Sequence, residues 1–241
     1  MTARPKLSVL MPVYNERATV AEAIRRVLDA ELPVDRELIV IDDGSTDGGA
    51  EVLATFQEPS VRVLTQPHNR GKGAAVRRGL AASSGDFIII HDADLEYDPR
   101  DWPALLRPAL EGDAVAVYGS RFTGERRNMM FWHWVGNRLI SLVTNVLYDS
   151  TLSDVETCSK LIAGDLARSL PLSADGFDID PEITALLLRA GVRIYEVPIR
   201  YVGREIYEGK KIRWHDGVTA LSTLVRHRVE PNRIKPRRPR A

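Results

Sequence analysis

Three carboxylates directly after a short apolar run are the strongest candidates for chemistry in this chain. Phe87–Ile90 has the pattern of a buried strand, and Asp92, Asp94 and Glu96 follow it at intervals of two residues. In an extended chain that spacing places them on one side. Carboxylates so close together repel, and an oxygen-only ligand set favours Mg²⁺ or Mn²⁺ shared with a substrate's phosphates. The alternative is a solvated acidic turn that caps the next helix.

The elements that would position this turn alternate regularly over residues 7–91. Strand patterns occur at 7–11, 37–41, 61–64 and 86–91, and helix patterns at 16–30, 47–56 and 71–83. Repeated β-α-β units predict an α/β fold with a Rossmann-like, mostly parallel sheet and helices on both faces. Ligands bind beyond the carboxyl ends of such strands. The polar clusters at 14–16, 42–44 and 92–94 all fall there, which favours a binding site.

The pattern changes after residue 97. We expect a helix over 102–110, a strand over 114–118 and a long apolar helix over 129–148. Strand and helix signals follow over 154–202, then a Gly/Lys/Arg-rich loop at 203–213 and a helix near 216–226. We expect one domain over 1–227 and a basic tail over 228–241.

Composition excludes several classes of protein. The 241 residues are 44% hydrophobic and can bury one substantial core. Cys158 is the single cysteine, so an internal disulfide is excluded and a reducing compartment is expected. No secretory signal and no run of 18 apolar residues is present, so we expect a cytoplasmic protein without a membrane span.

The zero net charge hides a basic end. Residues 226–241 hold seven Lys or Arg and one acid. Such a block is either a solvated, flexible tail or a segment attracted to anionic lipid or nucleic acid. We expect a membrane surface, and not nucleic acid, as its partner.

Three motifs in this order resemble the nucleotide-sugar-binding half of family 2 glycosyltransferases, which have the GT-A fold. They are MPVYNE at 11–16, IDDGSTD at 41–47 and DADLE at 92–96. The resemblance continues through 119–121, 154–160, 196–199 and 204–211, a set similar to the dolichyl- and polyprenyl-phosphate mannosyltransferase branch. It covers about residues 6–225 and implies a nucleotide-sugar half over about 6–97 and an acceptor half over about 98–227.

Carried over by position, the resemblance implies a set of residues that bind the nucleotide sugar. They are Pro12, Tyr14, Glu16, Ile41, Asp43, Asp92, Ala93, Asp94, Arg204 and Lys211. Tyr14 would offer a stacking face, and Asp43 would accept hydrogen bonds from base or ribose. Turn chemistry is the alternative for this region, since Asn15 and Asp42 favour turns. Lys72 is expected at the exposed start of a helix rather than at the diphosphate.

The resemblance also implies the catalytic groups, which would be Asp92, Asp94 and Arg121. Asp94 and Glu96 would hold the metal, and Asp92 would face the ribose or the sugar. The family often carries Gln where this chain has Glu96, and the added carboxylate should tighten metal binding. The metal would bridge both phosphates and stabilise the departing nucleoside diphosphate as a Lewis acid.

The acceptor decides which further groups are needed. A sugar hydroxyl requires a general base, whereas a lipid monophosphate is already ionised and requires only cations that hold it. Arg121, Arg138, Arg204 and Lys210 or Lys211 are candidate cations, since Arg binds phosphate bidentately. Each alone could be a surface ion-pair residue. The resemblance implies that Arg121, Arg138 and Ser141 contact the acceptor phosphate.

Residues 129–148 concern the lipid. Trp132, Val135, Leu139, Leu142, Val143 and Val146 share one helical face. Arg138 alone would make a membrane span unfavourable by roughly 3 kcal/mol. An interfacial helix fits better, and a buried core helix is the alternative.

Together these features predict an inverting, metal-dependent hexosyltransferase, peripheral at the cytoplasmic face of the membrane. It would move a mannose- or glucose-type hexose from a GDP- or UDP-linked sugar to polyprenyl phosphate. One alternative is a transferase that acts on a sugar hydroxyl in cell-surface polysaccharide or glycolipid synthesis. Another is a nucleotide-sugar-binding regulator without turnover. The sequence leaves the sugar, the nucleotide and the oligomeric state open.

Overall fold

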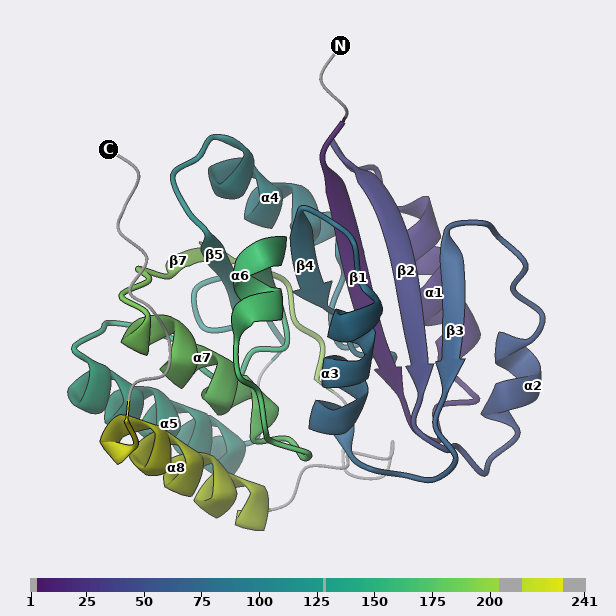
Figure 1. Cartoon of the computed structure of the whole chain (residues 1–241). Helices are drawn as coiled ribbons and strands as arrows, with labels where there is room; N and C mark the ends of the chain where they lie inside the picture. The colour runs from purple at the N-terminus through teal and green to yellow at the C-terminus, as the bar shows by residue number, and fades with distance from the viewer. Residues whose placement is uncertain (1–3, 128, 204–213, 232–241) are drawn as a thin grey trace.

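The computed structural model describes residues 4–127, 129–203 and 214–231. Within them seven strands form one sheet in the order β3-β2-β1-β4-β6-β5-β7 (Figure 1). The strands are β1 (Lys6–Val13), β2 (Asp35–Asp42), β3 (Val61–Thr65), β4 (Phe87–Ile90), β5 (Ala116–Ser120), β6 (Lys160–Ala163) and β7 (Tyr195–Pro198). The strands predicted over 7–11, 37–41, 61–64, 86–91 and 114–118 therefore exist, with boundaries shifted by at most two residues.

The sheet is mostly parallel, as predicted. β1 pairs in parallel with β2 and β4, β2 with β3, and β5 with β7. Among the strands of the described ranges, only β6 runs the other way, because it pairs antiparallel with both β4 and β5. The carboxyl ends of β1, β2 and β4 consequently meet at one edge of the sheet.

Helices cover both faces of the sheet, so the predicted fold class is confirmed. In Figure 1, α3 and α6 lie in front of the strands and α1 lies behind them. The helices are α1 (Val20–Asp29), α2 (Gly49–Leu53), α3 (Lys72–Ala82), α4 (Trp102–Leu110), α5 (Phe131–Tyr148), α6 (Gly164–Ser169), α7 (Ile179–Arg189) and α8 (Trp214–Val229), with a 3₁₀ turn at Pro99–Asp101. The two-sided cover explains why Leu38, Ile39 and Val40 are consecutive buried residues, since a parallel strand is enclosed on both faces.

The first helix begins four residues later than its apolar pattern predicts. Helix α1 starts at Val20 and buries Val20, Ala23, Ile24 and Val27 at helical spacing. Residues 14–16 stay in the preceding loop, where Asn15 has a φ of 51°. The Glu16 carbonyl accepts hydrogen bonds from the N–H groups of Thr19 and Val20. The loop that follows β1 is therefore free to contribute side chains to the sheet edge.

Helices α5, α7 and α8 form a second layer beside the sheet (Figure 1). Their shared core contains Ile140, Leu152, Val155, Ala185, Ala220 and Leu224. The Tyr148 hydroxyl donates to the Leu224 carbonyl at 2.7 Å, which ties α5 to α8. One side of α5 is thus buried, as the core-helix alternative predicts. The other side leaves Trp132 78%, Leu142 59% and Val146 75% exposed.

The C-terminal helix runs past the predicted start of the tail. Helix α8 continues to Val229, and Arg228 Nε donates to the Leu147 carbonyl at 2.8 Å. Residues 228 and 229 therefore belong to the helix, while 232–241 lie outside the described residues. Among the helices of the described ranges, none combines the length and apolar character needed to cross a bilayer.

Candidate active site

The carboxyl ends of β1, β2 and β4 open onto one cavity of about 1010 Å³. Most of the predicted site residues line it: Pro12, Tyr14, Glu16, Asp43, Asp92, Ala93, Asp94, Glu96 and Arg121. Its far wall comes from the start of α5, from α7 and from the first turn of α8. The sequence clusters that follow separate strands are therefore brought together in space.

Asp43, directly after β2, is fixed by the segment 66–71. Its Oδ1 accepts hydrogen bonds from Gln66 Nε2 at 2.7 Å and from the Arg70 N–H at 2.9 Å, and its Oδ2 accepts from the Gly71 N–H at 2.8 Å. Burial raises the pKa of Asp43, although these N–H groups favour its charged form. Position 71 requires glycine, because its φ is +95° and a Cβ would lie 2.3 Å from the Asp175 carbonyl oxygen.

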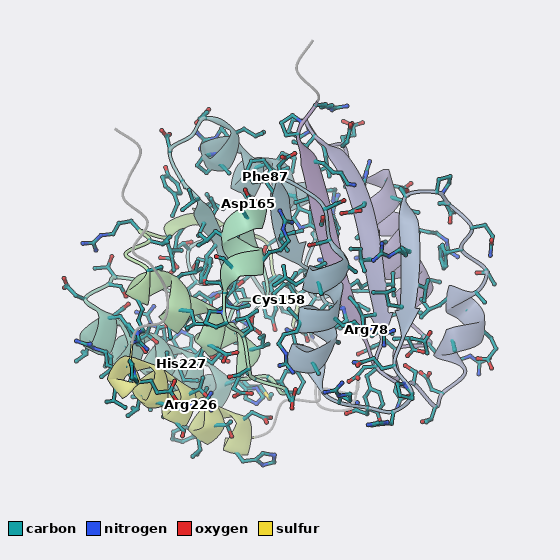
Figure 2. All side chains as sticks on the ribbon, in the orientation of Figure 1. Arg78, Phe87, Cys158, Asp165, Arg226 and His227 are labelled. Atoms are coloured by element: carbon teal, nitrogen blue, oxygen red, sulfur yellow. The ribbon has the colours of Figure 1, made fainter. Side chains whose placement is uncertain are left out.

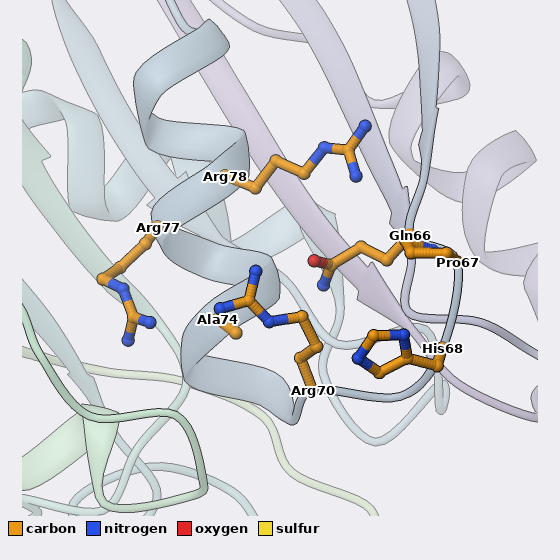
Figure 3. Close-up of a pocket in the computed structure, with 7 residues that line it drawn as sticks. All are labelled: Gln66, Pro67, His68, Arg70, Ala74, Arg77 and Arg78. Carbon is orange, nitrogen blue, oxygen red and sulfur yellow. The ribbon is translucent and has the colours of Figure 1, made fainter.

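The outer side of the same segment lines a second cavity, of about 690 Å³ (Figure 3). His68, Arg70 and Arg78 contribute to it, together with Arg77, which pairs with Asp175 at 2.5 Å. Gln66 connects the two cavities, because it lines the second one and its Nε2 donates to Asp43 in the first. The segment is therefore braced between α3 and the end of β2.

Lys72 joins the acidic turn to α7. Its Nζ lies 3.0 Å from Asp92 Oδ2 and 3.2 Å from Asp180 Oδ2, and Lys160 Nζ lies 2.8 Å from Asp180 Oδ1. Burial alone would lower the pKa of Lys72, but the carboxylates of Asp180 and Asp92 hold it well above its ordinary value. The expectation of an exposed residue at position 72 was wrong. The residue does start α3, but its side chain is only 10% exposed and lines the cavity.

Asp94 and Glu96 reach the cavity from a turn and not from an extended chain. Leu95 has a φ of 65°, and Asp94 Oδ1 accepts the Glu96 N–H at 3.1 Å. Glu96 Oε2 accepts the Tyr201 hydroxyl at 2.6 Å. Both carboxylates line the cavity, although the chain between them bends.

The donor set fits a hard divalent cation that shares its coordination with a ligand. Asp94 and Glu96 supply only oxygen, and Asp92 is engaged by Lys72. In the described ranges no three His, Cys, Asp or Glu side chains are arranged to hold a metal by themselves. Mg²⁺ is typically held by one or two carboxylates plus substrate phosphates. These residues therefore fit a cation that arrives with, or is completed by, a diphosphate.

Arg121 is buried in the cavity wall and is already paired. Its Nε and Nη2 each donate to Asp154 at 2.7 Å, and Nη2 also donates to Asn137 Oδ1 at 2.9 Å. Its guanidinium lies 5.2 Å from the centroid of the Tyr201 ring. Asp154 is fully buried, so this pair is a fixed part of the wall.

Three other predicted residues lie outside the cavity lining. Ile41 is fully buried beneath α3, close to Gly79. Arg138 is exposed on α5, with its guanidinium 5.7 Å from the Phe122 ring centroid. Ser141 is buried, and its hydroxyl donates to the Ser153 carbonyl at 3.4 Å. Arg204, Lys210 and Lys211 lie outside the described residues.

Sequence reasoning missed several polar residues that the cavity contains. Glu156, Cys158 and Asp180 line it, and Lys160 supports Asp180 from the interior. Figure 2 places Cys158 near the centre of the molecule. For Glu156, Cys158 and Lys160 the available signal was their place in the motif 154–160, and Asp180 lies outside that motif.

A family model described as glycosyl transferase family 2 matches residues 8–161. A low-salt glycan biosynthesis hexosyltransferase of Haloferax volcanii is 32% identical over 209 residues, which is 83% of this chain and 49% of that protein. A dolichol-phosphate mannosyltransferase of Pyrococcus furiosus is 29% identical over 220 residues, 86% of this chain and 60% of that protein.

An undecaprenyl-phosphate 4-deoxy-4-formamido-L-arabinose transferase of Pseudomonas aeruginosa is also similar, with 37% identity over 141 residues, 56% of this chain and 40% of that protein. The chain thus spans about half the length of these curated relatives. Among solved structures, glucosyl-3-phosphoglycerate synthase from Mycobacterium tuberculosis in complex with Mn²⁺, UDP and glucosyl-3-phosphoglycerate matches with a TM-score of 0.72 and 25% identity. The match covers 95% of this chain and 82% of that one.

Proposed function

Because the chain belongs to glycosyl transferase family 2, we propose that it moves a hexose from a nucleotide sugar to the phosphate of a polyprenyl lipid. The observation that carries this proposal is that the carboxylates following β2 and β4 line the same cavity as Arg121. Two relatives are named for dolichol phosphate and undecaprenyl phosphate, which supports a lipid phosphate as acceptor. Nucleotide sugar and acceptor would meet in this cavity.

The donor would bind along the ends of β1 and β2. Asp43 is fixed by three N–H donors, two on Oδ1 and one on Oδ2, so Oδ2 keeps a second lone pair for base or ribose. Tyr14 lines the same part of the cavity and can stack on the base. The solved neighbour was crystallised with UDP, so a UDP- or GDP-linked hexose is the proposed donor. Arg204 and Lys211 stay proposed diphosphate contacts.

Asp94 and Glu96 would hold the divalent cation, Mg²⁺ or Mn²⁺. Related solved structures contain Mn²⁺ or Mg²⁺ together with UDP. When bound, the cation would supply Lewis-acid stabilisation of the departing diphosphate. The chain itself would supply the carboxylates of Asp94 and Glu96 as ligands. Lys72 pairs with both Asp92 and Asp180 of α7, and so holds the Asp92 side chain near α7.

The proposed reaction is one displacement at the anomeric carbon. An oxygen of the acceptor phosphate forms the new bond while the bond to the nucleoside diphosphate breaks, so the configuration inverts. A phosphate monoester carries no proton that must be removed at neutral pH, so a base is not required. Asp92 would orient the hexose, and Arg121 would present positive charge to the acceptor.

The acceptor side is proposed to lie between Arg121 and the start of α5. Arg121 and Arg138 both flank the Phe122 ring, at 5.8 Å and 5.7 Å from its centroid. Their charges together would attract the lipid phosphate. Ser141 hydrogen-bonds the 153–155 loop, which carries Asp154, so we propose that it acts on the acceptor through that loop.

We also propose that the protein lies on the cytoplasmic face of a membrane. The exposed apolar side of α5, with Leu142 and Val146, would rest at the interface. The basic C-terminal segment would add attraction to anionic lipid. This placement brings the acceptor side of the cavity close to the surface that holds the lipid.

A sugar hydroxyl as acceptor is the second candidate function. Glu156 favours it, because it lines the cavity and burial raises its pKa to about 7, a value suited to a general base. The two functions differ in whether turnover requires that base.

Thermal unfolding with a panel of nucleotide sugars tests the donor half of the proposal. UDP-glucose, UDP-galactose, GDP-mannose and dTDP-glucose are added with and without Mn²⁺. We expect the melting temperature to rise for sugars of one nucleotide only, with a larger rise when Mn²⁺ is present. No rise with any of them would contradict the proposal.

A further inference from the structure

Glu156 lines the candidate active site but has no role in the lipid-phosphate reaction proposed above. It lies two residues after Asp154, which binds Arg121, and two residues before Cys158, whose pKa is raised by burial and by the nearby Asp92 carboxylate. The segment 154–158 thus runs from the acceptor side of the cavity to the donor side. In the proposed reaction the hexose occupies this interval, because its anomeric carbon lies between the two phosphates.

The cations near Glu156 are already paired with other groups. Lys160 Nζ binds Asp180 at 2.8 Å and the Thr157 carbonyl, and Arg121 makes two hydrogen bonds of 2.7 Å to Asp154. The Oε1 atom of Glu156 is buried and has no hydrogen-bond partner among the described residues. Glu156 therefore lies beside cations that lower its pKa but make no hydrogen bond to its Oε1.

An unpartnered buried carboxyl oxygen is unfavourable, because no hydrogen bond offsets its loss of water. Such a group in a folded protein calls for an explanation, and a ligand is one. Burial and the neighbouring Asp180 raise the pKa of Glu156 to about 7, so both its forms are present near neutral pH. The ionised form accepts a hydrogen bond and the protonated form also donates one, which suits a hydroxyl group. The ionised form would repel a phosphate, so a phosphate is not the expected partner.

We propose that Glu156 is a specificity residue that hydrogen-bonds a hydroxyl group of the transferred hexose. This inference rests on the proposed function, because it requires a nucleotide hexose as donor. Glu156 would thus contact the sugar, whereas other carboxylates of the cavity would bind the nucleotide and the cation at the diphosphate. A carboxyl that reads one hydroxyl would discriminate between hexoses that differ at that carbon.

Titration calorimetry separates this role from the others. Wild type, Glu156→Ala, Glu156→Gln and Glu156→Met are titrated with UDP, UDP-glucose, GDP and GDP-mannose in Mn²⁺. For the nucleotide that binds, we expect every variant to bind the nucleoside diphosphate within twofold of wild type. We expect the nucleotide hexose to bind at least tenfold more weakly to the Ala and Met variants and within about threefold to Gln, which can still hydrogen-bond. Glu111→Gln is the matched control at an exposed position.

Three results would overturn the inference. Equal losses for the nucleoside diphosphate and the nucleotide hexose would mean that Glu156 serves the fold, and unchanged affinities for both would mean that Glu156 does not contact the hexose. A Gln variant that keeps donor affinity but loses more than a hundredfold in kcat would make Glu156 a general base. The Met variant keeps the side-chain volume, so it supplies the answer if the Ala variant does not fold. If neither UDP nor GDP binds wild type, the proposed function fails and the inference fails with it.

Discussion

Lys72 divides the carboxylates of the acidic turn into two kinds. It lies 3.0 Å from Asp92 and links that carboxylate to Asp180 on α7. Asp94 and Glu96 face the cavity from the turn around Leu95. We infer that the carboxylate fixed by the ammonium group orients the sugar and that the other two serve the cation.

Replacing Asp94 by Asn tests that division. The amide keeps the shape but loses the charge that a divalent cation requires, so we expect turnover to fall by more than a hundredfold. We also expect Mn²⁺ to stop enhancing nucleotide binding, while the melting temperature stays within about 2 °C of wild type. Asp113→Asn, at an exposed position outside the cavity, is the control. Wild-type activity that persists in excess EDTA would refute the metal role.

Glu156 gives a pH dependence of known sign. Its pKa is raised from 4.5 to about 7 by burial, so between these values the folded protein holds a proton that the unfolded chain has released. The stability that Glu156 contributes is therefore present below pH 4.5 and is lost as pH rises through 7. The Gln side chain of Glu156→Gln cannot titrate. As pH rises from 4.5 to 7, the free energy of unfolding of this variant should therefore increase relative to that of wild type, by up to roughly 3 kcal/mol. Urea unfolding from pH 4.5 to 8 measures the difference. A constant difference across the window would mean that the carboxyl is not desolvated.

The apolar side of α5 has a consequence for membrane attachment. Leu142 and Val146 are exposed and lie outside the cavity lining, so replacing both by Ser should leave the nucleotide site intact. We expect partitioning onto lipid vesicles to fall roughly tenfold or more, because each side chain loses part of its apolar transfer energy. Leu110→Ser with Val115→Ser, two exposed apolar residues outside α5, is the matched control. Equal losses in both double variants, or none in either, would exclude α5 as the attached face.

The elements were predictable where a local pattern specifies them. Strands β1, β2 and β4 each contain a run of apolar residues, which predicted them. Helix α4 spans the predicted residues 102–110. The reversed direction of β6 was not predictable, because pairing with β4 and β5 leaves no mark in the four residues of the strand. The start of α1 was missed because residues 16–19 fit the helical pattern but form the loop of the site.

The candidate site shows the same division. The motifs placed Asp43, Asp92 and Asp94 at strand ends, and the structure brings them to one cavity. The partners of these groups come from distant parts of the chain. Lys72 and Asp180 are 108 residues apart, and Arg121 and Asp154 are 33 apart. Pairs so far apart in the sequence form only when the helices pack, and a local pattern does not reveal them. Lys72 was therefore expected to be exposed.

At the level of the molecule, charge and apolar surface are proposed to act together at a membrane. Residues 232–241 contain five Lys or Arg, each worth about 1 kcal/mol at most near an anionic surface and less in salt. A chain ending at Pro231 keeps all of α8, so we expect an unchanged melting temperature. Binding to anionic vesicles should fall at least tenfold at low salt, and what remains should depend little on salt. Sedimentation with neutral and anionic vesicles measures both. Equal binding of the full and shortened chains would leave α5 as the sole attachment.

The acceptor distinguishes the proposed function from its rival, and the chemistry of the product identifies the acceptor. Purified protein is incubated with the radiolabelled nucleotide hexose that raises its melting temperature, Mn²⁺ and detergent-solubilised polyprenyl phosphate, with Asp94→Asn as the inactive control. We expect wild type alone to form a lipid-soluble product in which the sugar is released by mild acid and survives alkali, as a sugar phosphodiester should. Transfer only to a sugar hydroxyl, or a lipid product that resists mild acid, would contradict a polyprenyl phosphate acceptor.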